Sequence, residues 1–371
     1  MPGSTLPPFP DDVRTHPLLI IDYELIKAGD VEEVNRLWEA ATTIGFWYLK
    51  NHSADQEVSD MFDMGAETMA LPLEERMKFE QGDNGQSFGY KKVGANAVDA
   101  TGTLDSADFI NVSKDDALAY PQVVHRTYPS TVNTRMENTI APFVRKGLEV
   151  THAVFNVFND KLGLPKGTLE RLHDMEEHSG SETRCIRSPP TQVKKVVKSL
   201  AILGAHTDFG SLVGNWTYGI CCFFKYYQSF LHNRLGGLQV LPPGHDEWSY
   251  IRPIPGHAVC NIGDALSLFS GGILQSNIHR VVAPPGVQAE YERWSLVFFT
   301  RPGNSKVLRA LVESSHIIAE AVKKRPERNF ETGSTAAEWF ARRIKNQRIS
   351  NRTGPETWAA SRGTEHTPTV V

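Results

Sequence analysis

Two residues of types that bind metal ions lie close together near the middle of the sequence. His206 and Asp208 are separated by a single residue. On an extended backbone alternate side chains point to the same face, so both can reach one ion. Such a short pair is also common as a hydrogen-bonded surface pair, and it needs a third ligand before it indicates a metal site. We expect His279, from a later strand, to be that ligand.

The three predicted ligands leave one side of the metal free. Two histidines and one carboxylate with open positions are the arrangement that non-haem Fe(II) oxygenases use. Further along, Arg293 and Ser295 lie two positions apart in an apolar segment that is typical of a buried strand. An arginine inside a protein needs an anion, and its planar guanidinium matches a carboxylate. The pattern therefore predicts an acidic co-substrate beside the metal.

In this order, the residues resemble the isopenicillin-N-synthase-like family of Fe(II)/2-oxoglutarate dioxygenases, and in particular its fungal-type members. The resemblance covers roughly residues 17–302 of the sequence. It includes four further motifs, Gly45–His52, Gly236–Val240, Asn261–Asp264 and His279–Val281.

This resemblance implies a role for each candidate residue. His206, Asp208 and His279 would be the catalytic residues and would hold Fe(II). Arg293 and Ser295 would bind the distal carboxylate of 2-oxoglutarate, the co-substrate that is consumed together with O2. The implied reaction oxidises a small organic substrate by hydroxylation, desaturation or ring formation. It releases succinate and CO2, and we expect it to belong to secondary metabolism.

Three other functions stay open on the sequence alone. An iron oxidase of the same fold that does not use 2-oxoglutarate would form no succinate. A binding protein without activity would fail to bind iron. A zinc hydrolase on a cupin-like barrel would be active with zinc and indifferent to oxygen. The residue types at the metal also do not identify the substrate.

One position departs from the family pattern. Many relatives have a tyrosine just before a proline at the end of the first barrel strand, where it helps to bind 2-oxoglutarate, and Ser188 stands there in this sequence. Because its hydroxyl can still form a hydrogen bond, we predict Ser188 as a third cofactor-binding residue. Arg184 or Arg187 could compensate for the tyrosine, or could lie on a solvated strand edge. Tyr90, in a Gly-rich loop at 82–102, either contacts substrate or only packs the loop.

Short strands that alternate with Gly and Pro turns predict an α+β protein built on a double-stranded β-helix, the antiparallel jelly-roll or cupin-like barrel. The family resemblance implies the same fold. We expect a mostly helical N-terminal support region at residues 1–178 and the dioxygenase barrel at 179–303. A C-terminal helical extension and tail would occupy 304–371.

Apolar periodicity and end signals predict the individual elements. The predicted helices are 31–44, 55–70, 129–162, 305–325 and 334–349. The predicted strands are 18–22, 46–50, 236–241, 247–252, 258–262, 267–269 and 276–282. The last helix carries four basic residues that we expect on a solvated face, Arg342, Arg343, Lys345 and Arg348. His152 and His173 lack partners at metal-binding spacing and are predicted to be core or surface residues.

An aromatic stretch interrupts the family pattern after Leu212. Residues 213–228 have neither the turn residues nor the period expected of a connection between neighbouring strands. A valine codon begins with GT and a glutamine codon can end with AG, the dinucleotides that bound a spliced intron. One hypothesis is therefore a retained intron. The other is a real lid over the site with four aromatic contacts, Trp216, Tyr218, Phe223 and Tyr226.

Composition narrows the class of partner. A formal net charge of -4 and a pI of about 6.4 give no basic surface for nucleic acid or for an anionic membrane. The four cysteines have no zinc-type spacing, which favours reduced thiols in the cytosol. No apolar segment is long enough to span a bilayer. We therefore predict a cytoplasmic enzyme with a small-molecule substrate and no nucleic-acid, membrane or implied protein partner.

Overall fold

The computed structural model describes residues 6–190, 201–216 and 235–363. Within these ranges an eight-stranded sheet has the order β1-β2-β10-β7-β12-β5-β4-β3, and a four-stranded sheet has the order β6-β11-β8-β9. The strands are β1 (Ile20–Asp22), β2 (Phe46–Lys50), β3 (Gly89–Lys91), β4 (Asp108–Ser113), β5 (Glu182–Ser188), β6 (Ala201–His206), β7 (Leu212–Trp216), β8 (Leu238–Val240), β9 (Ser249–Tyr250), β10 (Ala258–Ile262), β11 (His279–Val282), β12 (Arg293–Thr300), and the separate pair β13 (Val307–Arg309) and β14 (Glu331–Thr335).

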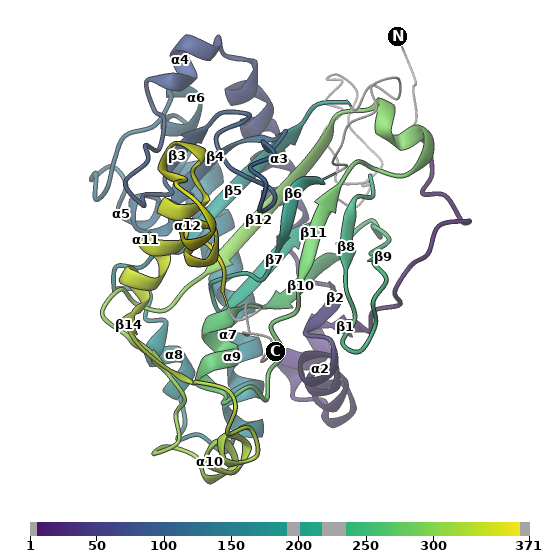
Figure 1. The fold of residues 1–371 in the computed structure, drawn as a ribbon, viewed down its shortest axis with the longest axis vertical. Coiled ribbons are helices and arrows are strands. Elements are labelled where there is room, and N and C mark those ends of the chain that lie inside the picture. Colours follow the sequence, from purple (N-terminus) through teal and green to yellow (C-terminus); the bar gives the residue numbers. More distant parts are fainter. Residues whose placement is uncertain (1–5, 191–200, 217–234, 364–371) are drawn as a thin grey trace.

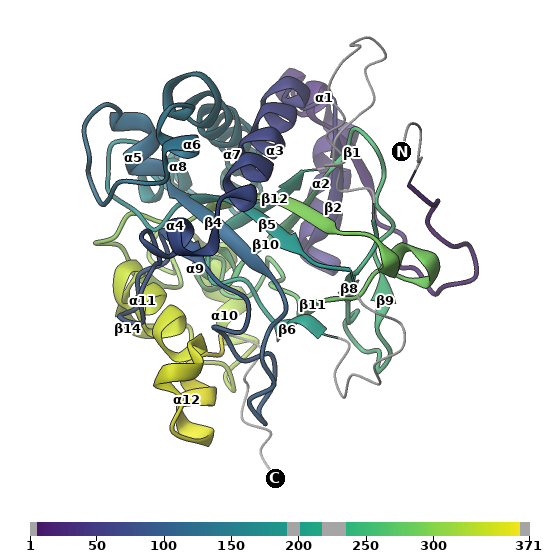
Figure 2. The same ribbon diagram turned by 90° about the horizontal axis from the view of Figure 1, so that it is seen from above.

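Helices cover one face of the eight-stranded sheet. Figures 1 and 2 show α2, α3 and α7 on this face, whereas β6, β8 and β11 lie on the opposite side. The α-helices are α1 (Tyr23–Ala28), α2 (Val31–Thr43), α3 (Asp55–Ala70), α4 (Leu73–Met77), α5 (Lys114–Ala119), α6 (Ser130–Asn133), α7 (Ala141–Lys161), α8 (Thr168–Leu172), α9 (Asp264–Phe269), α10 (His316–Lys323), α11 (Ala336–Gln347) and α12 (Pro355–Ala360). Short turns of other helix types are η1 (Met136–Ile140), η2 (Gly286–Glu290) and η3 (Ile349–Asn351).

Successive side chains of β5 point to opposite faces of the sheet and so contribute to two separate apolar layers. Cys185 faces the helices, so close to α3 that a Cβ on Gly65 would lie 2.1 Å from its sulfur. Ile186 faces the other way and packs in a second cluster with Phe109 and Val297. This second cluster lies between the two sheets, so it forms the interior of the barrel.

The structure confirms most of the predicted N-terminal elements. The predicted helices at 31–44 and 55–70 are α2 and α3, and α2 begins after Asp30, whose carboxylate accepts a hydrogen bond of 2.9 Å from the Glu33 N–H. The predicted helix at 129–162 is divided into α6, η1 and α7. Pro142 lies in the first turn of α7, where a missing N–H costs no hydrogen bond.

Several C-terminal predictions are wrong. The predicted strand at 267–269 is part of helix α9, because such a short apolar segment suits either element. The predicted helix at 305–325 begins instead with β13, and only α10 is helical. Helix α11 begins after Thr335, not Ser334, and Thr335 forms a reciprocal capping box with Glu338.

Strand β7 changes the predicted extent of the insertion. It pairs with β10 on one side and with β12 on the other, so residues 213–216 belong to the central sheet. Trp216 is buried on the helical side, with ring centroids 4.6 Å from His52 and 5.8 Å from Phe143. The predicted substrate contact from Trp216 is therefore wrong. Residues 217–228, and with them the choice between a lid and a retained intron, lie outside the described residues.

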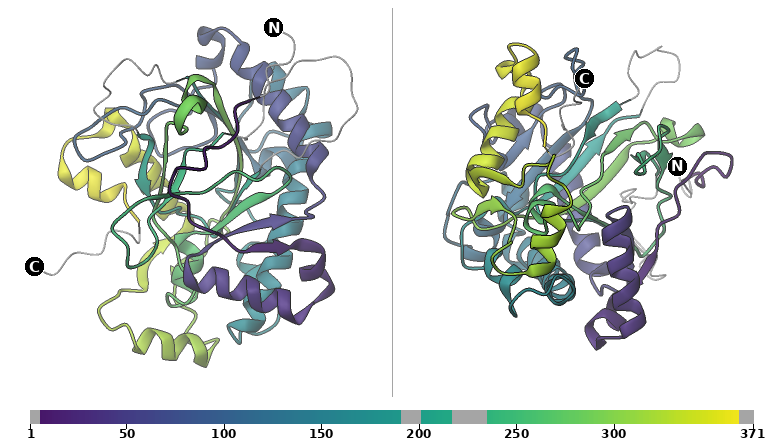
Figure 3. Two further views of the ribbon diagram at one scale, coloured as in Figure 1. Left: turned by 90° about the vertical axis from the view of Figure 1, so that its right-hand side faces the viewer. Right: turned by 60° about the horizontal axis from the view of Figure 1, so that its bottom comes forward.

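The chain before β1 runs along the edge of the four-stranded sheet (Figure 3). Thr15 forms a bridge with Tyr250 of β9, and Asp11 forms an ion pair of 2.8 Å with Arg252. Strands from both sides of residue 178 share the eight-stranded sheet. Among the residues described, no helix combines the length and apolar character needed to cross a membrane.

Candidate active site

The three predicted metal ligands converge at one end of the four-stranded sheet. His206 ends β6, Asp208 lies in the turn after it, and His279 begins β11 directly opposite His206. One Asp208 oxygen lies 3.6 Å from His206 Nε2, and the other lies 3.4 Å from His279 Nε2. Metal bonds of about 2.1 Å that meet at right angles need ligand atoms about 3 Å apart. Small shifts would therefore close this set around one ion.

Backbone carbonyls orient both imidazoles. His206 Nδ1 lies 2.7 Å from the Gly204 carbonyl oxygen, and His279 Nδ1 lies 3.1 Å from that of Asn277. A carbonyl only accepts hydrogen bonds, so each Nδ1 carries a proton and Nε2 is the nitrogen left for a metal. Phe46 packs edge-on against the His279 ring, with centroids 5.4 Å apart. These contacts orient the rings so that Nε2, and not Nδ1, of each histidine faces Asp208.

The Asp208 carboxylate is held in its charged form. Burial raises its pKa, but His279, His206 and the Asn261 amide lower it by more, so the net pKa lies well below its usual range. Asn261 Nδ2 donates to Asp208 at 2.8 Å. The Asn261–Asp264 motif is part of the family resemblance, but the sequence does not predict this role for Asn261. The available signal was a lone amide in the otherwise apolar strand β10.

The predicted co-substrate residues line the same cavity as the metal ligands. Arg293 is buried, which lowers its pKa to about 10. Its Nε donates to the Gly236 carbonyl at 2.8 Å and its Nη1 to the Ser295 hydroxyl at 2.5 Å, and it has no ion pair within the described chain. Ser188 lies opposite Arg293 in the sheet, with a buried hydroxyl that has no hydrogen-bond partner among the described residues. A buried guanidinium beside an unsatisfied hydroxyl suits a carboxylate ligand.

Close packing behind Arg293 explains the glycine pair that begins the Gly236–Val240 motif. Gly237 has φ +116°, and a Cβ there would lie 2.6 Å from the Val282 carbonyl oxygen and 3.1 Å from Arg293 Nε. Any other residue would be strained and would displace the guanidinium or strand β11.

The structure separates the remaining candidates on and beside β5. Arg184 lines the cavity. Arg187 points away from it and forms an ion pair of 2.8 Å with Asp108, so it does not replace the missing tyrosine. Tyr90 is buried and donates to the same carboxylate at 3.1 Å, so it packs the loop and does not line the cavity. Residues 96–98 of this loop do line it.

The C-terminal extension supports the metal-binding turn, in contrast to the predicted solvated face. Arg343 is completely buried, with an ion pair to Asp264 and a hydrogen bond of 2.9 Å to the Thr207 carbonyl. Asp264 accepts a hydrogen bond of 3.1 Å from the Thr207 hydroxyl, and its N–H donates to the Asp208 carbonyl at 2.7 Å. The prediction that Arg343 is a surface charge is therefore wrong.

Three other C-terminal residues have structural positions that the sequence does not predict. Arg348, predicted to be solvated, is buried and ion-paired with Glu80 and Asp83. Trp358 and Arg362 line the cavity, and Arg362 donates to the Ala205 carbonyl beside the first metal ligand. Helical periodicity does not reveal these positions, because their partners lie far away in the sequence.

His173 and the described cysteines are core residues. His173 is buried and lies 2.6 Å from both the Leu169 carbonyl and the Ser211 hydroxyl. Neither His173 nor His152 belongs to a group of ligands in the part of the chain that the structure covers. Cys185 and Cys260 are buried free thiols, while Cys221 and Cys222 lie outside the described residues.

Family models match both halves of the chain. Residues 18–133 match the non-haem dioxygenase in morphine synthesis N-terminal domain, and residues 224–302 match the 2OG-Fe(II) oxygenase superfamily. The second match contains His279, Arg293 and Ser295, and it begins after the first two predicted metal ligands.

Known proteins are similar over most of the chain. A 2-oxoglutarate-dependent dioxygenase of Aspergillus fumigatus is 26% identical over 337 residues, which cover 82% of this chain and 80% of the relative. Homoarginine-6-hydroxylase of Oryza sativa subsp. japonica is 29% identical over 276 residues, which cover 72% of this chain and 76% of the relative.

Solved structures show the predicted jelly-roll fold. A full-length Neurospora crassa protein, solved in complex with alpha-KG, has a TM-score of 0.69 at 20% identity and covers 88% of this chain and 95% of its own. JOX2 in complex with 2OG, Fe and JA has a TM-score of 0.63 at 20% identity, and the match covers 91% of this chain and 94% of JOX2. The matched models, the related sequences and the fold agree. The chain therefore belongs to the Fe(II)/2-oxoglutarate-dependent dioxygenases of the isopenicillin-N-synthase-like family.

Proposed function

We propose that His206, Asp208 and His279 hold Fe(II) in this dioxygenase. We further propose that Arg293, together with Ser295 and Ser188, binds the distal carboxylate of 2-oxoglutarate. The observation that supports both assignments is the convergence in one cavity of two oriented imidazoles, a charged carboxylate and a buried guanidinium without an ion-pair partner among the described residues. The donor types and their spacing suit a small divalent cation with open positions.

Bound Fe(II) and 2-oxoglutarate supply the oxidation of a substrate C–H bond by O2, with release of succinate and CO2. The chain contributes binding, orientation and exclusion of water. Arg293 holds the far end of the co-substrate, so that only the other end is directed towards the metal ligands. Ile186 and Val297 cover part of the cavity wall with apolar surface. The backbone carbonyls behind the two histidines keep their protons on Nδ1.

The substrate is a small organic molecule. We infer a place in secondary metabolism from the similarity to a dioxygenase of a filamentous fungus. A cytosolic location also stays a prediction. Hydroxylation, desaturation and ring formation all remain compatible with the residues at the metal.

An anaerobic titration tests the metal assignment. Fe(II) followed by 2-oxoglutarate should produce the visible metal-to-ligand charge-transfer band, and succinate should form once O2 is admitted. Asp208→Ala should abolish the band, because two imidazoles alone give the ion too few anchors. A full band in Asp208→Ala, or 2-oxoglutarate turnover at the unmodified rate, would refute the assignment.

The same band measures the role of Arg293. Arg293→Leu removes charged hydrogen bonds worth about 1.5 to 3 kcal/mol, which corresponds to about a tenfold to more than a hundredfold loss of affinity for 2-oxoglutarate. Arg252→Leu is the matched control, because Arg252 is exposed and its ion pair with Asp11 lies on the surface. Equal 2-oxoglutarate affinity in the two variants would rule out the proposed role.

A further inference from the structure

The cavity wall holds more positive charge than its described carboxylates balance. Glu182, on the interior face of β5, is completely buried and forms ion pairs with Arg184 at 2.9 Å and Arg301 at 3.1 Å. Neither arginine has another ion-pair partner within the described ranges. One carboxylate therefore serves two guanidiniums, and one positive charge is left over. A buried charge without compensation is costly, which makes such a position a candidate binding site.

The metal side of the cavity does not provide the missing negative charge. Under the proposed function, Fe(II) with Asp208 carries one positive charge, 2-oxoglutarate carries two negative charges, and Arg293 carries one positive charge. These charges cancel. Beyond the described ranges, Glu365 is the only acidic side chain in the sequence. Glu182 therefore leaves one positive charge over on the Arg184 and Arg301 pair. Arg362, which also lines the cavity, donates instead to the Ala205 carbonyl.

Arg184 is held in place with part of its guanidinium unused. Its guanidinium carbon lies 4.1 Å from the centre of the Phe109 ring and 4.8 Å from that of Phe299. Its Nε donates to the Asn111 side chain at 2.7 Å, and its Nη1 forms no hydrogen bond in the described chain. Burial lowers the pKa of Arg184, although Glu182 and the nearby Asp208 raise it. The group thus faces the cavity close to a metal ligand.

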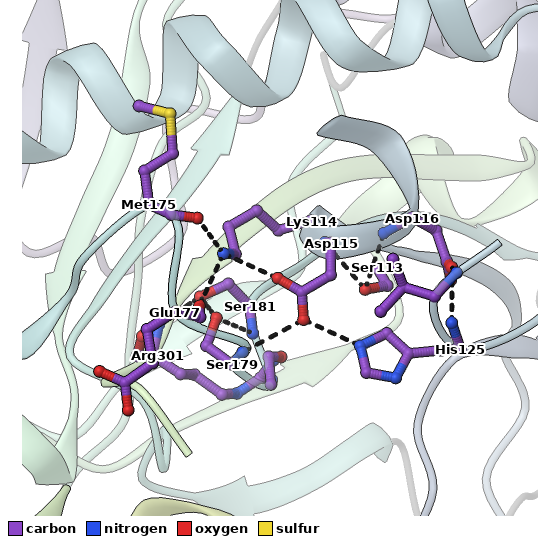
Figure 4. Close-up of polar contacts among 12 residues, drawn as sticks. Ser113, Lys114, Asp115, Asp116, His125, Met175, Glu177, Ser179, Ser181 and Arg301 are labelled. Atoms are coloured by element: carbon purple, nitrogen blue, oxygen red, sulfur yellow. Dashed lines mark hydrogen bonds and ion pairs between the residues drawn. The ribbon is translucent and has the colours of Figure 1, made fainter. Parts of the chain in front are cut away.

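Arg301 is fixed by the loop at residues 177–181. Its side chain donates to the Gly180 carbonyl, and its backbone N–H donates to the Ser181 hydroxyl at 2.9 Å. Figure 4 shows that this loop is anchored from α5. Lys114 Nζ donates to the Glu177 carbonyl at 3.0 Å, and Asp115 accepts a hydrogen bond of 3.2 Å from the Ser179 N–H. A positively charged group on such a fixed support is preorganised for a ligand.

Strand register places this charge away from the co-substrate residues. Ser188 pairs with Arg293, whereas Arg184 pairs with Val297 on the same two strands. A separation of four residues corresponds to about 13 Å at about 3.3 Å per residue. Ile186 lines the wall between these positions, and Val297 lines it beside Arg184. A molecule that extends along this wall from the co-substrate residues towards Arg184 would therefore meet apolar surface first and positive charge last.

We propose that Arg184 and Arg301 form a subsite for the carboxylate of the substrate. This inference rests on the proposed function, because it assumes that Arg293 is occupied by 2-oxoglutarate. The substrate is then a small monocarboxylic acid with an apolar skeleton. A single surplus charge matches a monoanion and does not match a phosphate dianion.

Matched acids and amides test the subsite. The protein is loaded anaerobically with Fe(II) and saturating 2-oxoglutarate, and the charge-transfer band is titrated with phenylacetate, hexanoate and their primary amides. If the band does not form, the proposed function fails, not the subsite. If the band forms, we expect each acid to perturb it with a dissociation constant at least tenfold below that of its amide. Equal binding of acids and amides, or no binding by either acid, would overturn the proposal.

Variants connect the preference to the two arginines. Arg184→Gln should remove the preference for acids and leave the affinity for 2-oxoglutarate unchanged, while Arg184→Lys should retain part of the preference. Arg187→Gln, on the outer face of the same strand, is the matched control and should keep all of it. Glu365→Gln should also keep it. An unchanged preference in Arg184→Gln would contradict the subsite, as would its loss in Arg187→Gln.

Arg301→Gln gives a second measurement on a buried position. Circular dichroism and the charge-transfer band show whether the variant folds and binds 2-oxoglutarate. A folded variant should lose the preference for acids. If Arg301→Gln does not fold, Arg184→Gln alone decides between the subsite and its absence.

Discussion

At the scale of single residues, Asn261 determines how the Asp208 carboxylate is held. Its amide is the donor at 2.8 Å to the oxygen that also lies 3.4 Å from His279. Asn261→Leu keeps the approximate shape and removes this donor. Loss of such a supporting hydrogen bond typically weakens metal binding about tenfold to a hundredfold, and we expect that loss of Fe(II) affinity. Titration against a competing chelator measures it.

Gln56→Leu is the matched control for this substitution. Gln56 also donates an amide hydrogen bond of 2.8 Å to a carboxylate, that of Asp60, but on the surface of α3. Its removal should leave Fe(II) affinity unchanged. The same Fe(II) affinity in both variants would show that Asn261 does not support the metal site.

The sequence predicts individual site residues where chemistry and spacing coincide. The one-residue separation of His206 and Asp208 already shows that both can face one ion, and the structure brings them within reach of His279. By contrast, Arg343 lies among other basic residues on a helix, and this pattern is typical of a solvated face. Its partner Asp264 is 79 residues away. No local pattern reveals a pairing over such a distance.

At the scale of elements, helix α11 couples the C-terminal extension to the metal-binding turn through Arg343. Arg343→Met would leave Asp264 buried without its cation and the Thr207 carbonyl without its donor. Removing one partner of a buried ion pair costs about 3 to 5 kcal/mol. We expect that decrease in the free energy of unfolding, measured by urea denaturation, together with weaker Fe(II) binding.

Lys345→Met on the same helix is the control for Arg343→Met. Lys345 is exposed, so its replacement should change the free energy of unfolding by no more than about 0.5 kcal/mol. Comparable destabilisation by both substitutions would show that Arg343 is not a buried support of the site.

Strand β7 contains the first four residues of the aromatic stretch at 213–228, and its packing can be tested. Trp216 is 2% exposed and packs against α7. Trp216→Ala should therefore cost about 3 to 5 kcal/mol of unfolding free energy. Trp248→Ala is the control, since Trp248 is only partly buried and should cost less. Similar small effects of both substitutions would show that residues 213–216 do not occupy the central strand in the folded protein.

Transcript sequencing between the Leu212 and Ser229 codons tests whether residues 213–228 are a retained intron. The sixteen codons of residues 213–228 should be present if the segment belongs to the mature protein. Their absence from most transcripts would support the retained intron, and residues after 228 would then have to supply the strand between β10 and β12. Sequence patterns alone could not place this boundary, because an aromatic segment suits a buried strand as well as an insertion.

Elements with strong periodicity and clear ends were predicted well. Helix α3 matches its predicted range, because its apolar face is regular and Pro72 follows shortly after its end. Short elements were predicted poorly. Residues 267–269 form part of α9, where the backbone N–H groups of Asp264 and Ala265 bond to the metal-binding turn. Such tertiary contacts override the weak preference of a short apolar segment.

At the scale of the whole molecule, one sheet connects the parts that the sequence separates. Strands β1 to β4 from the N-terminal half flank the barrel strands in the eight-stranded sheet. Helix α7 packs on this sheet, and a Cβ on its Gly147 would lie 2.6 Å from the Phe298 ring of β12. We therefore expect the support region and the barrel to unfold together in a single transition.

Two buried histidines make this unfolding depend on pH. Burial lowers the pKa of His173 to about 4, and it likewise lowers that of His52 to about 4. An unfolded histidine titrates near 6.5, so the unfolded chain takes up protons first as the pH falls. The stabilising contribution of each neutral ring is complete above about pH 6.5 and is lost progressively between about pH 6.5 and 4.

His173→Gln tests this dependence. The amide can still form hydrogen bonds but does not titrate, so the free energy of unfolding should fall less steeply between pH 6.5 and 5 than in the unmodified protein. The difference in this fall should approach about 2 kcal/mol at pH 5, since one unit of pKa shift corresponds to about 1.4 kcal/mol. Urea denaturation at several pH values measures it. His316→Gln, at an exposed position of α10, should leave the slope unchanged, and parallel curves for His173→Gln and the unmodified protein would show that His173 takes up its proton without unfolding.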